Sequence, residues 1–272
     1  MIETRFWSGD TELAWTDSGG DGDPLLLIHG GGLADWFTPM AAEPALKRHR
    51  VIRMVRAGYT GAPVPGGLTV GDFGDHAAAV LRQLGTGPAH VVAHSSGSAV
   101  ALQLAVDHPE LVRTLSLCEP PLLDALVAPE DLAQLHAVLG PAIGAAMAAV
   151  ARGDVAAAFE AFMTPVCGPD HRRVMESVLG VDVVSPSAYF FTGEMPAVGA
   201  WDVDLARVRV RVLLVLGTDS PPPVHRLVAR LAGLIPGASV ATIAGAGHLM
   251  PLTHAAELSR VIDAFCHTHA RA

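Results

Sequence analysis

Short runs of apolar residues recur along the chain, and most are followed by a turn and then by a longer stretch with helical spacing. This order is typical of a parallel sheet that is buried on both faces by helices. The predicted strands of this kind are residues 24–28, 51–55, 90–93, 114–118, 210–216 and 239–243. The predicted helices between them are residues 34–46, 70–84, 96–107, 222–234 and 254–267.

The N-terminal segments 4–8 and 12–17 have a different pattern, because polar and apolar residues alternate in both. Gly9 and Asp10 separate them, which favours an antiparallel hairpin at one edge of the sheet. The predicted fold class is therefore α/β, with a mostly parallel sheet of about eight strands flanked by helices.

The alternation of strands and helices stops after Glu119 and resumes near Arg207. Within this interval, residues 129–139, 155–162 and 169–178 have helical patterns. We predict a helical lid inserted after the sixth strand, at residues 120–206, and a core built from residues 1–119 and 207–272. Such an insertion either selects substrates or serves only as a stabilising cover.

Composition limits the possible partners. The chain has 272 residues, half of them apolar, which suffices for a large core. Its formal net charge of -9 opposes binding to polyanions, so we expect no nucleic acid partner. The oligomeric state does not follow from the sequence.

The termini and cysteines indicate an ordinary cytoplasmic protein. The first residues are polar and lack the basic and then apolar layout of a secretory signal. The apolar run 137–151 is shorter than a membrane span needs and is expected to be interrupted by Gly140, Pro141 and Gly144, so we expect a buried or pocket-lining helix and no membrane insertion. Three cysteines without paired spacing indicate neither a disulfide framework nor a metal site.

The segment 91–98, Val-Val-Ala-His-Ser-Ser-Gly-Ser, joins a predicted strand to an Ala- and Leu-rich helix. A serine at such a sharp turn projects its hydroxyl away from the sheet, and the small residues Ala93 and Gly97 avoid a collision across the bend. Ser95 is therefore the candidate nucleophile, and the backbone N–H of Ser96 is a candidate oxyanion donor. The simpler alternative is a serine that only caps the helix.

A second turn, His29-Gly30-Gly31-Gly32, follows the strand 24–28. Glycines allow the backbone to approach a substrate carbonyl closely, and a backbone N–H there can stabilise a developing negative charge. Gly31 is the first choice of donor and Gly32 the alternative. We interpret His29 as a structural residue of the turn.

The base and acid are predicted from their positions after strands. His248 lies on a loop of small residues after the strand 239–243, where it could accept the proton of Ser95. His254 is a weaker alternative because a helix should begin there. Asp219 follows the strand 210–216 and gives the common chain order of serine, acid and histidine. Glu119, at the end of the strand 114–118, is the alternative acid.

With these motifs assembled, the chain resembles the α/β-hydrolase superfamily, in particular its lidded, cofactor-free branch of esterases, lactonases, thioesterases and haloperoxidase-like proteins. Residues 51–61 also resemble the loop after the fourth strand of that family, although Val55 replaces the customary aspartate before Arg56. The resemblance implies attack of Ser95 on a carbonyl carbon, an acyl-enzyme, and its hydrolysis by water without metal or nucleotide. Epoxide hydrolases and haloalkane dehalogenases are disfavoured, because they carry an aspartate nucleophile where this chain has Ser95.

The expected substrate is a small apolar ester, lactone or thioester. Aromatic side chains near the first glycine turn and in the predicted lid could line an apolar pocket. These candidates are Trp36, Phe37, Phe159, Phe162, Tyr189 and Phe190. The alternative function is non-hydrolytic, either small-molecule binding or a cyclisation or elimination in the same pocket. Asp219 leaves that alternative open. It lies one residue before the position where many members of the family carry the acid, which is Ser220 here, and could therefore orient the histidine poorly.

Overall fold

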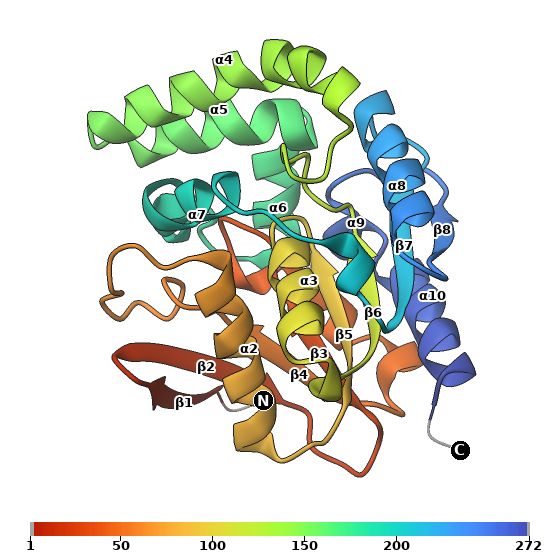
Figure 1. Ribbon diagram of the computed structural model, residues 1–272. Coiled ribbons are helices and arrows are strands. Elements are labelled where there is room, and N and C mark those ends of the chain that lie inside the picture. The colour runs from red at the N-terminus through yellow and green to blue at the C-terminus, as the bar shows by residue number, and fades with distance from the viewer. Residues whose placement is uncertain (1–2, 271–272) are drawn as a thin grey trace.

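The computed structural model describes residues 3–270 and contains an eight-stranded sheet in the order β1-β2-β4-β3-β5-β6-β7-β8 (Figure 1). The strands are β1 (Glu3–Ser8), β2 (Thr11–Asp17), β3 (Pro24–Ile28), β4 (Arg50–Val55), β5 (Ala89–His94), β6 (Val112–Cys118), β7 (Arg211–Gly217) and β8 (Ser239–Ile243). β1 and β2 form the predicted antiparallel hairpin, β2 pairs antiparallel with β4, and the remaining pairs are parallel. The predicted fold class is confirmed.

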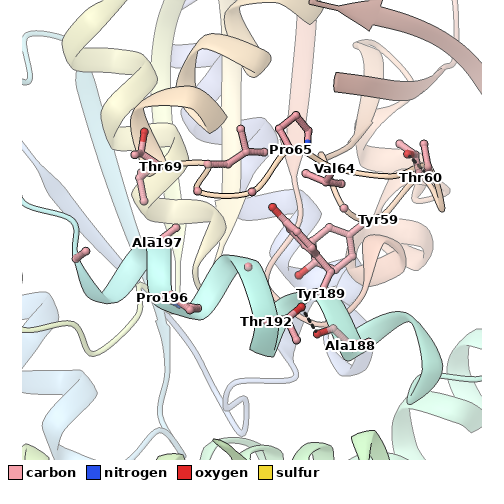
Figure 2. A pocket seen from close by; sticks show the side chains of 18 of the residues that line it. Tyr59, Thr60, Val64, Pro65, Thr69, Ala188, Tyr189, Thr192, Pro196 and Ala197 are labelled. Atoms are coloured by element: carbon pink, nitrogen blue, oxygen red, sulfur yellow. Dashed lines mark hydrogen bonds between the residues drawn. The ribbon is translucent and has the colours of Figure 1, made fainter. Parts of the chain in front are cut away.

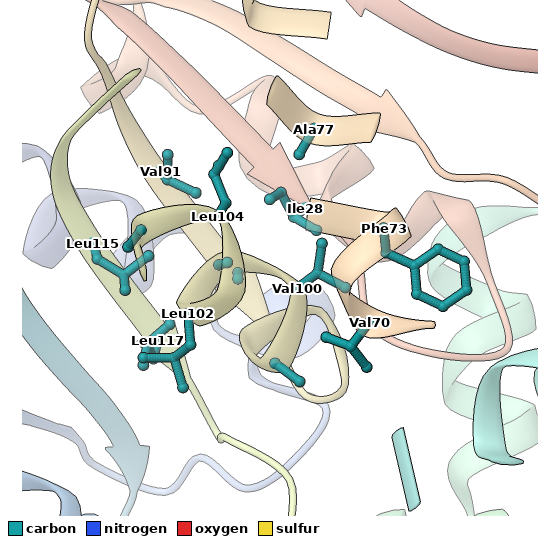
Figure 3. Packing of buried hydrophobic residues seen from close by; sticks show 14 of the residues in the cluster. Ile28, Val70, Phe73, Ala77, Val91, Val100, Leu102, Leu104, Leu115 and Leu117 are labelled. Atoms are coloured by element: carbon teal, nitrogen blue, oxygen red, sulfur yellow. The ribbon is translucent and has the colours of Figure 1, made fainter. Parts of the chain in front are cut away.

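Helices cover both faces of the sheet, as the apolar strands require. One face is covered by α2 (Val70–Leu84), α3 (Gly97–Asp107) and α8 (Pro222–Leu234). The other is covered by α1 (Thr38–Ala41), α9 (Met250–Thr253) and α10 (Ala255–Thr268). The strand residues alternate between these layers: Leu26 and Ile28 pack on the α2–α3 side, whereas Leu25 and Leu27 pack on the α10 side. Figure 3 shows Ile28, Val91 and Leu104 in the first layer.

Local sequence signals determine where α2 begins and ends. The Thr69 side chain accepts a hydrogen bond from the Asp72 N–H, and the Asp72 carboxylate accepts one from the Thr69 N–H, which is a complete capping box. Gly85 ends the helix with φ 60°, a conformation that glycine adopts without steric cost.

The prediction of one continuous helix at residues 34–46 was wrong. That segment contains a 3-10 turn (Ala34–Phe37), the short helix α1 and a second 3-10 turn (Pro44–Leu46). Pro39 and Pro44 each lie at the start of a new turn, where their missing N–H costs nothing. The chain therefore bends repeatedly and folds back against the sheet.

After β6 and Glu119 the chain forms helices, which we call the helical insertion (residues 120–210). It contains α4 (Leu132–Ala151), α5 (Val155–Cys167), α6 (His171–Leu179), a π-helical turn (Phe190–Glu194) and α7 (Met195–Gly199), with 3-10 turns at Pro129–Asp131, Ser185–Ser187 and Leu205–Arg207. Figure 1 shows these helices beyond the carboxyl ends of β5 and β6.

The helix α4 continues through Gly140, Pro141 and Gly144, so the expectation that these residues interrupt the apolar run was wrong. Packing of Leu135, Ala146 and Ala149 in the insertion outweighs the helix-breaking cost of the proline. Most of the helix is exposed rather than buried. By length and composition alone, residues Pro129–Ala151 are long and apolar enough to cross a membrane, and 17% of the apolar window is buried in the protein.

Candidate active site

Ser95 lies directly after β5 and begins the turn into α3, as predicted. Its φ of 51° is in the left-handed region, where a residue with a side chain is strained. The turn is held by hydrogen bonds from the Ser95 N–H to the Cys118 carbonyl (3.0 Å) and from the Ser98 N–H to the Ser95 carbonyl (2.8 Å). Such strain is characteristic of residues that the surrounding structure holds for function rather than for stability.

The turn from β5 through Ser95 into α3 tolerates only small residues where it crosses the glycine turn after β3. A Cβ atom at Gly97 would lie 2.5 Å from the His29 carbonyl oxygen and 2.7 Å from that of Ile28. A Cβ atom at Gly30 would lie 2.8 Å from Nδ1 of His94 and 3.2 Å from Cβ of Ser95. These close approaches are the physical reason for glycine at both positions, and they bring the two turns together.

His248 lies against Ser95. Its Nε2 is 3.1 Å from Oγ of Ser95, a hydrogen-bonding distance. The loop that carries His248 is held by His94, whose Nε2 lies 2.9 Å from the His248 carbonyl oxygen. The ring centroids of the two histidines are 4.7 Å apart, with the rings tilted by 45°. Burial, together with the nearby His248, holds the pKa of His94 well below its ordinary value. Because a carbonyl oxygen can only accept a hydrogen bond, Nε2 of His94 is the donor in this contact. The structure thus brings Ser95 and His248 together.

Glu119, the alternative candidate for the acid, lies beside His248. Its Oε2 lies 3.6 Å from Nδ1 of His248, and its side chain is 1% exposed. Its Oε1 accepts hydrogen bonds from the Gly217 N–H (2.9 Å) and from the Ser220 hydroxyl (2.6 Å). Burial acts to raise the pKa of Glu119, but the interaction with His248 and the hydrogen bonds from Ser220 and Gly217 outweigh it, and the pKa is lowered.

The prediction that Asp219 is the acid does not fit the structure. Asp219 is exposed, its carboxylate accepts a hydrogen bond from the Thr218 hydroxyl (3.1 Å), and its N–H binds the Ala246 carbonyl (2.9 Å). The tight turn after Gly217 directs Ser220 toward the inside, where it binds Glu119. Glu119 itself has φ 49°, so Ser95 and Glu119 are the two residues other than glycine with positive φ among residues 3–270.

Gly31 and Ser96 are the remaining candidates for an oxyanion hole. Both line the same cavity as Ser95, and within residues 3–270 neither N–H has a hydrogen-bond acceptor in the protein. The alternative donor Gly32 does not fit, because its N–H already binds the Tyr59 hydroxyl at 2.9 Å. His29 has the structural position expected of it: it is buried, and its Nε2 accepts a hydrogen bond from the Arg56 N–H at 3.2 Å.

Glu194, in the π-helical turn, is a site residue that the sequence pattern does not predict. Its side chain is fully buried and forms an ion pair with Arg56 at 2.8 Å, and it accepts a hydrogen bond from the Ser96 hydroxyl at 2.5 Å. No local pattern in the insertion identifies this residue. The sequence signal related to it is Arg56, which directly follows a strand predicted to be buried on both faces, where a charged side chain needs a buried partner.

An apolar cavity of about 520 Å³ opens at the candidate triad, beneath α4 and beside α8. Its polar end is formed by Ser95, Ser96, Glu119 and His248. Its walls are mostly aliphatic and include Leu122, Leu123, Leu135, Val138, Leu139, Ile143, Met163, Val224 and Leu227. A cavity with a few polar groups at one end and apolar walls is typical of a small-molecule site.

Three of the six predicted pocket aromatics line this cavity: Trp36, Phe162 and Phe190. The other three do not. Phe37 packs under the sheet with Leu25 and Leu27, and Phe159 packs inside the insertion, 5.4 Å from the His171 ring.

Tyr189, the third residue that does not line the cavity, lies in a separate hollow of about 1140 Å³ between residues 58–71 and 185–202 (Figure 2). There its ring packs edge to face on Tyr59 at 5.8 Å. None of Ser95, Glu119 and His248 lines this hollow. It is therefore separate from the candidate active site, although Tyr59 connects it to the glycine turn.

Metal ligands do not gather at the site. Within residues 3–270, no three His, Cys, Asp or Glu side chains come close enough together to hold a metal ion. The chemistry available to the described residues is that of a serine, a histidine and a carboxylate beside backbone donors.

A mostly parallel sheet with a strained serine, a histidine and a buried carboxylate beyond the carboxyl ends of its strands defines the α/β-hydrolase class of protein. In agreement, residues 25–261 match the model of the Alpha/beta hydrolase family, and the chain belongs to this family.

Parts of the chain are similar in sequence to known hydrolases. The chain is 39% identical over 102 residues to a 2-hydroxymuconate semialdehyde hydrolase of Pseudomonas putida, covering 36% of each protein. It is 29% identical over 119 residues to the (E)-2-((N-methylformamido)methylene)succinate hydrolase of Acinetobacter baylyi, covering 43% of this chain and 45% of that protein. These alignments therefore span less than half the length of the relatives.

Two solved structures resemble the whole chain. The enol-lactonase from Burkholderia xenovorans LB400 has a TM-score of 0.79 at 20% identity and covers 97% of this chain and 100% of its own. A thermophilic esterase from Thermogutta terrifontis has a TM-score of 0.75 at 20% identity, covering 99% of this chain and 100% of its own. At this identity the likeness establishes the shared fold.

Proposed function

We propose that this protein is a serine hydrolase that cleaves a small apolar ester, lactone or thioester through an acyl-enzyme on Ser95. The observation that supports this most strongly is the chain of contacts from Ser95 Oγ to His248 Nε2 (3.1 Å) and from His248 Nδ1 to Glu119 (3.6 Å). Contacts of this kind often tighten when substrate binds.

In the proposed reaction, the Ser95 oxygen attacks the carbonyl carbon while His248 Nε2 accepts the hydroxyl proton. Glu119 holds the imidazole with Nδ1–H directed toward the carboxylate and stabilises the imidazolium. The negative charge on the carbonyl oxygen is stabilised by the N–H groups of Gly31 and Ser96. The imidazolium then protonates the leaving alkoxide or thiolate, and water, activated by His248, hydrolyses the acyl-enzyme.

The proposed substrate class rests on the cavity. Its walls are aliphatic and aromatic, so an apolar acyl or alcohol group gains free energy by leaving water. Apart from Glu119 at the polar end, its charged residues include the partly exposed Arg226 and Asp131, which form an ion pair at 3.2 Å. We further propose that the helical insertion acts as the lid of this cavity. The names of the relatives, a semialdehyde hydrolase and an enol-lactonase among them, also point to carbonyl substrates.

The non-hydrolytic alternative loses its main motivation. It rested on an acid displaced to Asp219, whereas Glu119 lies against His248. We therefore propose hydrolysis alone. We further propose that the protein uses no metal or organic cofactor, is cytoplasmic, and acts on a small molecule rather than on nucleic acid or within a membrane.

The test is labelling by an active-site fluorophosphonate, read by intact mass, together with hydrolysis of a short-chain aryl ester. We expect one adduct on the wild type, none on Ser95→Ala, and hydrolysis only by the wild type. Ser98→Ala is the matched control, because Ser98 lies three residues further along, in the first turn of α3, and is fully buried. A folded wild type that forms no adduct and leaves the ester intact contradicts the proposal.

A further inference from the structure

Glu194 is connected to both halves of the candidate oxyanion hole. Its Oε1 accepts hydrogen bonds from the Ser96 hydroxyl (2.5 Å) and from Nη2 of Arg56 (2.8 Å), and its Oε2 accepts one from the Tyr59 hydroxyl. The side chains of Glu194 and Arg56 are 0% and 1% exposed. All three donors come from the core of the fold, whereas Glu194 belongs to the insertion.

Two of these donors also bind the glycine turn. Nη2 of Arg56 donates to the Gly30 carbonyl (3.1 Å), and the Tyr59 hydroxyl accepts the Gly32 N–H (2.9 Å). Gly31, the candidate donor to the oxyanion, lies between these two fixed points. Glu194 therefore restrains the glycine turn through Arg56 and Tyr59, and restrains the other candidate donor, Ser96, directly.

The local backbone explains how the insertion reaches this position. Phe190–Glu194 is a π-helical turn, a rare conformation that is frequent at functional sites. Phe190 at its start lines the cavity, where its ring occupies the space that a Cβ atom at Gly31 would need, 2.3 Å away. One turn of the insertion thus forms both a wall of the cavity and the support of the hole.

We propose that Glu194 is a positioning residue for the oxyanion hole: it fixes the Ser96 N–H and the Gly31 N–H relative to each other, so that the hole forms only when the Phe190–Glu194 turn is seated. This inference rests on the proposed function. A hole contributes to the rate because its donors are already oriented before charge develops, so donors that are free to move lose most of that contribution. The expected signature is a lower kcat with little change in KM.

A thionoester distinguishes this role from that of a simple structural tether. Its sulfur is larger than oxygen and a weaker hydrogen-bond acceptor, so it gains less from a well-formed hole than the matching oxygen ester does. A variant with a disordered hole therefore loses rate mainly on the oxygen ester. A variant that is merely less stable loses active protein, and its rates on both substrates fall by the same factor.

The experiment compares the wild type, Glu194→Gln and Glu176→Gln on an aryl oxygen ester and its thionoester. Glu176 is the matched control, because it is a partly exposed glutamate of the same insertion and its ion pair is with Arg172 on its own helix. For Glu194→Gln we expect kcat on the oxygen ester to fall about 100-fold, KM to change little, and the ratio of oxygen-ester to thionoester rates to fall about 10-fold or more. Glu176→Gln should keep the wild-type ratio.

Ser96→Ala provides a second test in case Glu194→Gln does not fold. It removes only the hydrogen bond from the Ser96 hydroxyl to Glu194 and leaves the Arg56–Glu194 pair intact. It should lower the same ratio to a smaller extent. An unchanged ratio in folded Glu194→Gln, or in Ser96→Ala when the first variant does not fold, overturns the positioning role while the wild type still hydrolyses the ester. A wild type without hydrolysis or fluorophosphonate adduct overturns the proposed function, and this inference with it.

Discussion

The Glu119 carboxylate lies 3.6 Å from Nδ1 of His248, and it reaches the histidine from the end of β6 rather than from the end of β7. The β7 end still contributes, because the Gly217 N–H and the Ser220 hydroxyl both donate to the other oxygen of Glu119. With one oxygen held in this way, the second is directed toward the imidazole. Two neighbouring strands thus orient a single acid.

Glu119→Gln should lower kcat by about 10³- to 10⁴-fold with little loss of stability. The amide oxygen can still accept the hydrogen bonds from Gly217 and Ser220, but an amide cannot stabilise the imidazolium form of His248. Asp219→Asn is the matched control and should keep wild-type activity. Steady-state kinetics on an aryl ester measures both, and the opposite ranking of the two variants would restore Asp219 as the acid.

The strain at Ser95 predicts a measurable difference between two inactive variants. Because φ of Ser95 is 51°, Ser95→Gly should be more stable than Ser95→Ala by about 1 kcal/mol in the free energy of unfolding. Glycine adopts the left-handed conformation without the strain that alanine has there. At Ser98, inside α3, the order should reverse, since glycine is the poorer helix former by about 1 kcal/mol. Urea unfolding of the four proteins measures both differences, and equal stability of the two Ser95 variants would show that the turn is unstrained.

The buried pair of Arg56 and Glu194 predicts a strong asymmetry between single and double substitutions. Arg56→Met leaves the Glu194 carboxylate buried without its cation, which should destabilise the fold by about 3–5 kcal/mol. Adding Glu194→Met removes that uncompensated charge and should recover part of the loss. Equilibrium unfolding of the single and double variants gives the comparison. Strictly additive losses would mean that the two charges do not depend on each other.

The Asp263 carboxylate predicts a pH dependence of stability. Burial acts to raise its pKa, but hydrogen bonds from Arg48 and His49 outweigh burial and lower it. The stability gained by the ionised group is therefore present above the ordinary aspartate pKa of about 3.9, and it is lost as the pH falls through the lower pKa of the folded state. The stability gap between the wild type and Asp263→Asn should be widest near neutral pH and narrow in acid. A gap that does not vary with pH in urea unfolding would contradict this.

Much of the fold could be predicted because local and global signals agree. Residues 70–84 and 222–234 are helices with the predicted bounds, since caps and prolines mark their ends, and the buried strands appear as continuous apolar runs. Residues 34–46 were harder, because the same apolar spacing suits one helix or several short turns that pack against the sheet.

The site was predictable where backbone geometry requires particular residue types. The small residues around Ser95 and the glycine turn identify positions that only such residues can occupy. The acid was not predictable in this way, because the turn after Gly217 decides whether Asp219 or Ser220 faces inward, and both are compatible with the sequence. Glu194 depends on a pairing 138 residues distant from Arg56, which no local pattern specifies.

The position of Glu119 just before the helical insertion affects how this protein could diversify. Ser95 and Glu119 each follow directly on one of two paired neighbours in the sheet, β5 and β6, so the distance between them does not depend on what the chain does afterwards. An exchanged or lengthened insertion could therefore bring a new substrate range without moving the acid away from the nucleophile. The structural cost of such an exchange would fall instead on the Phe190–Glu194 turn, which a graft would have to retain or replace.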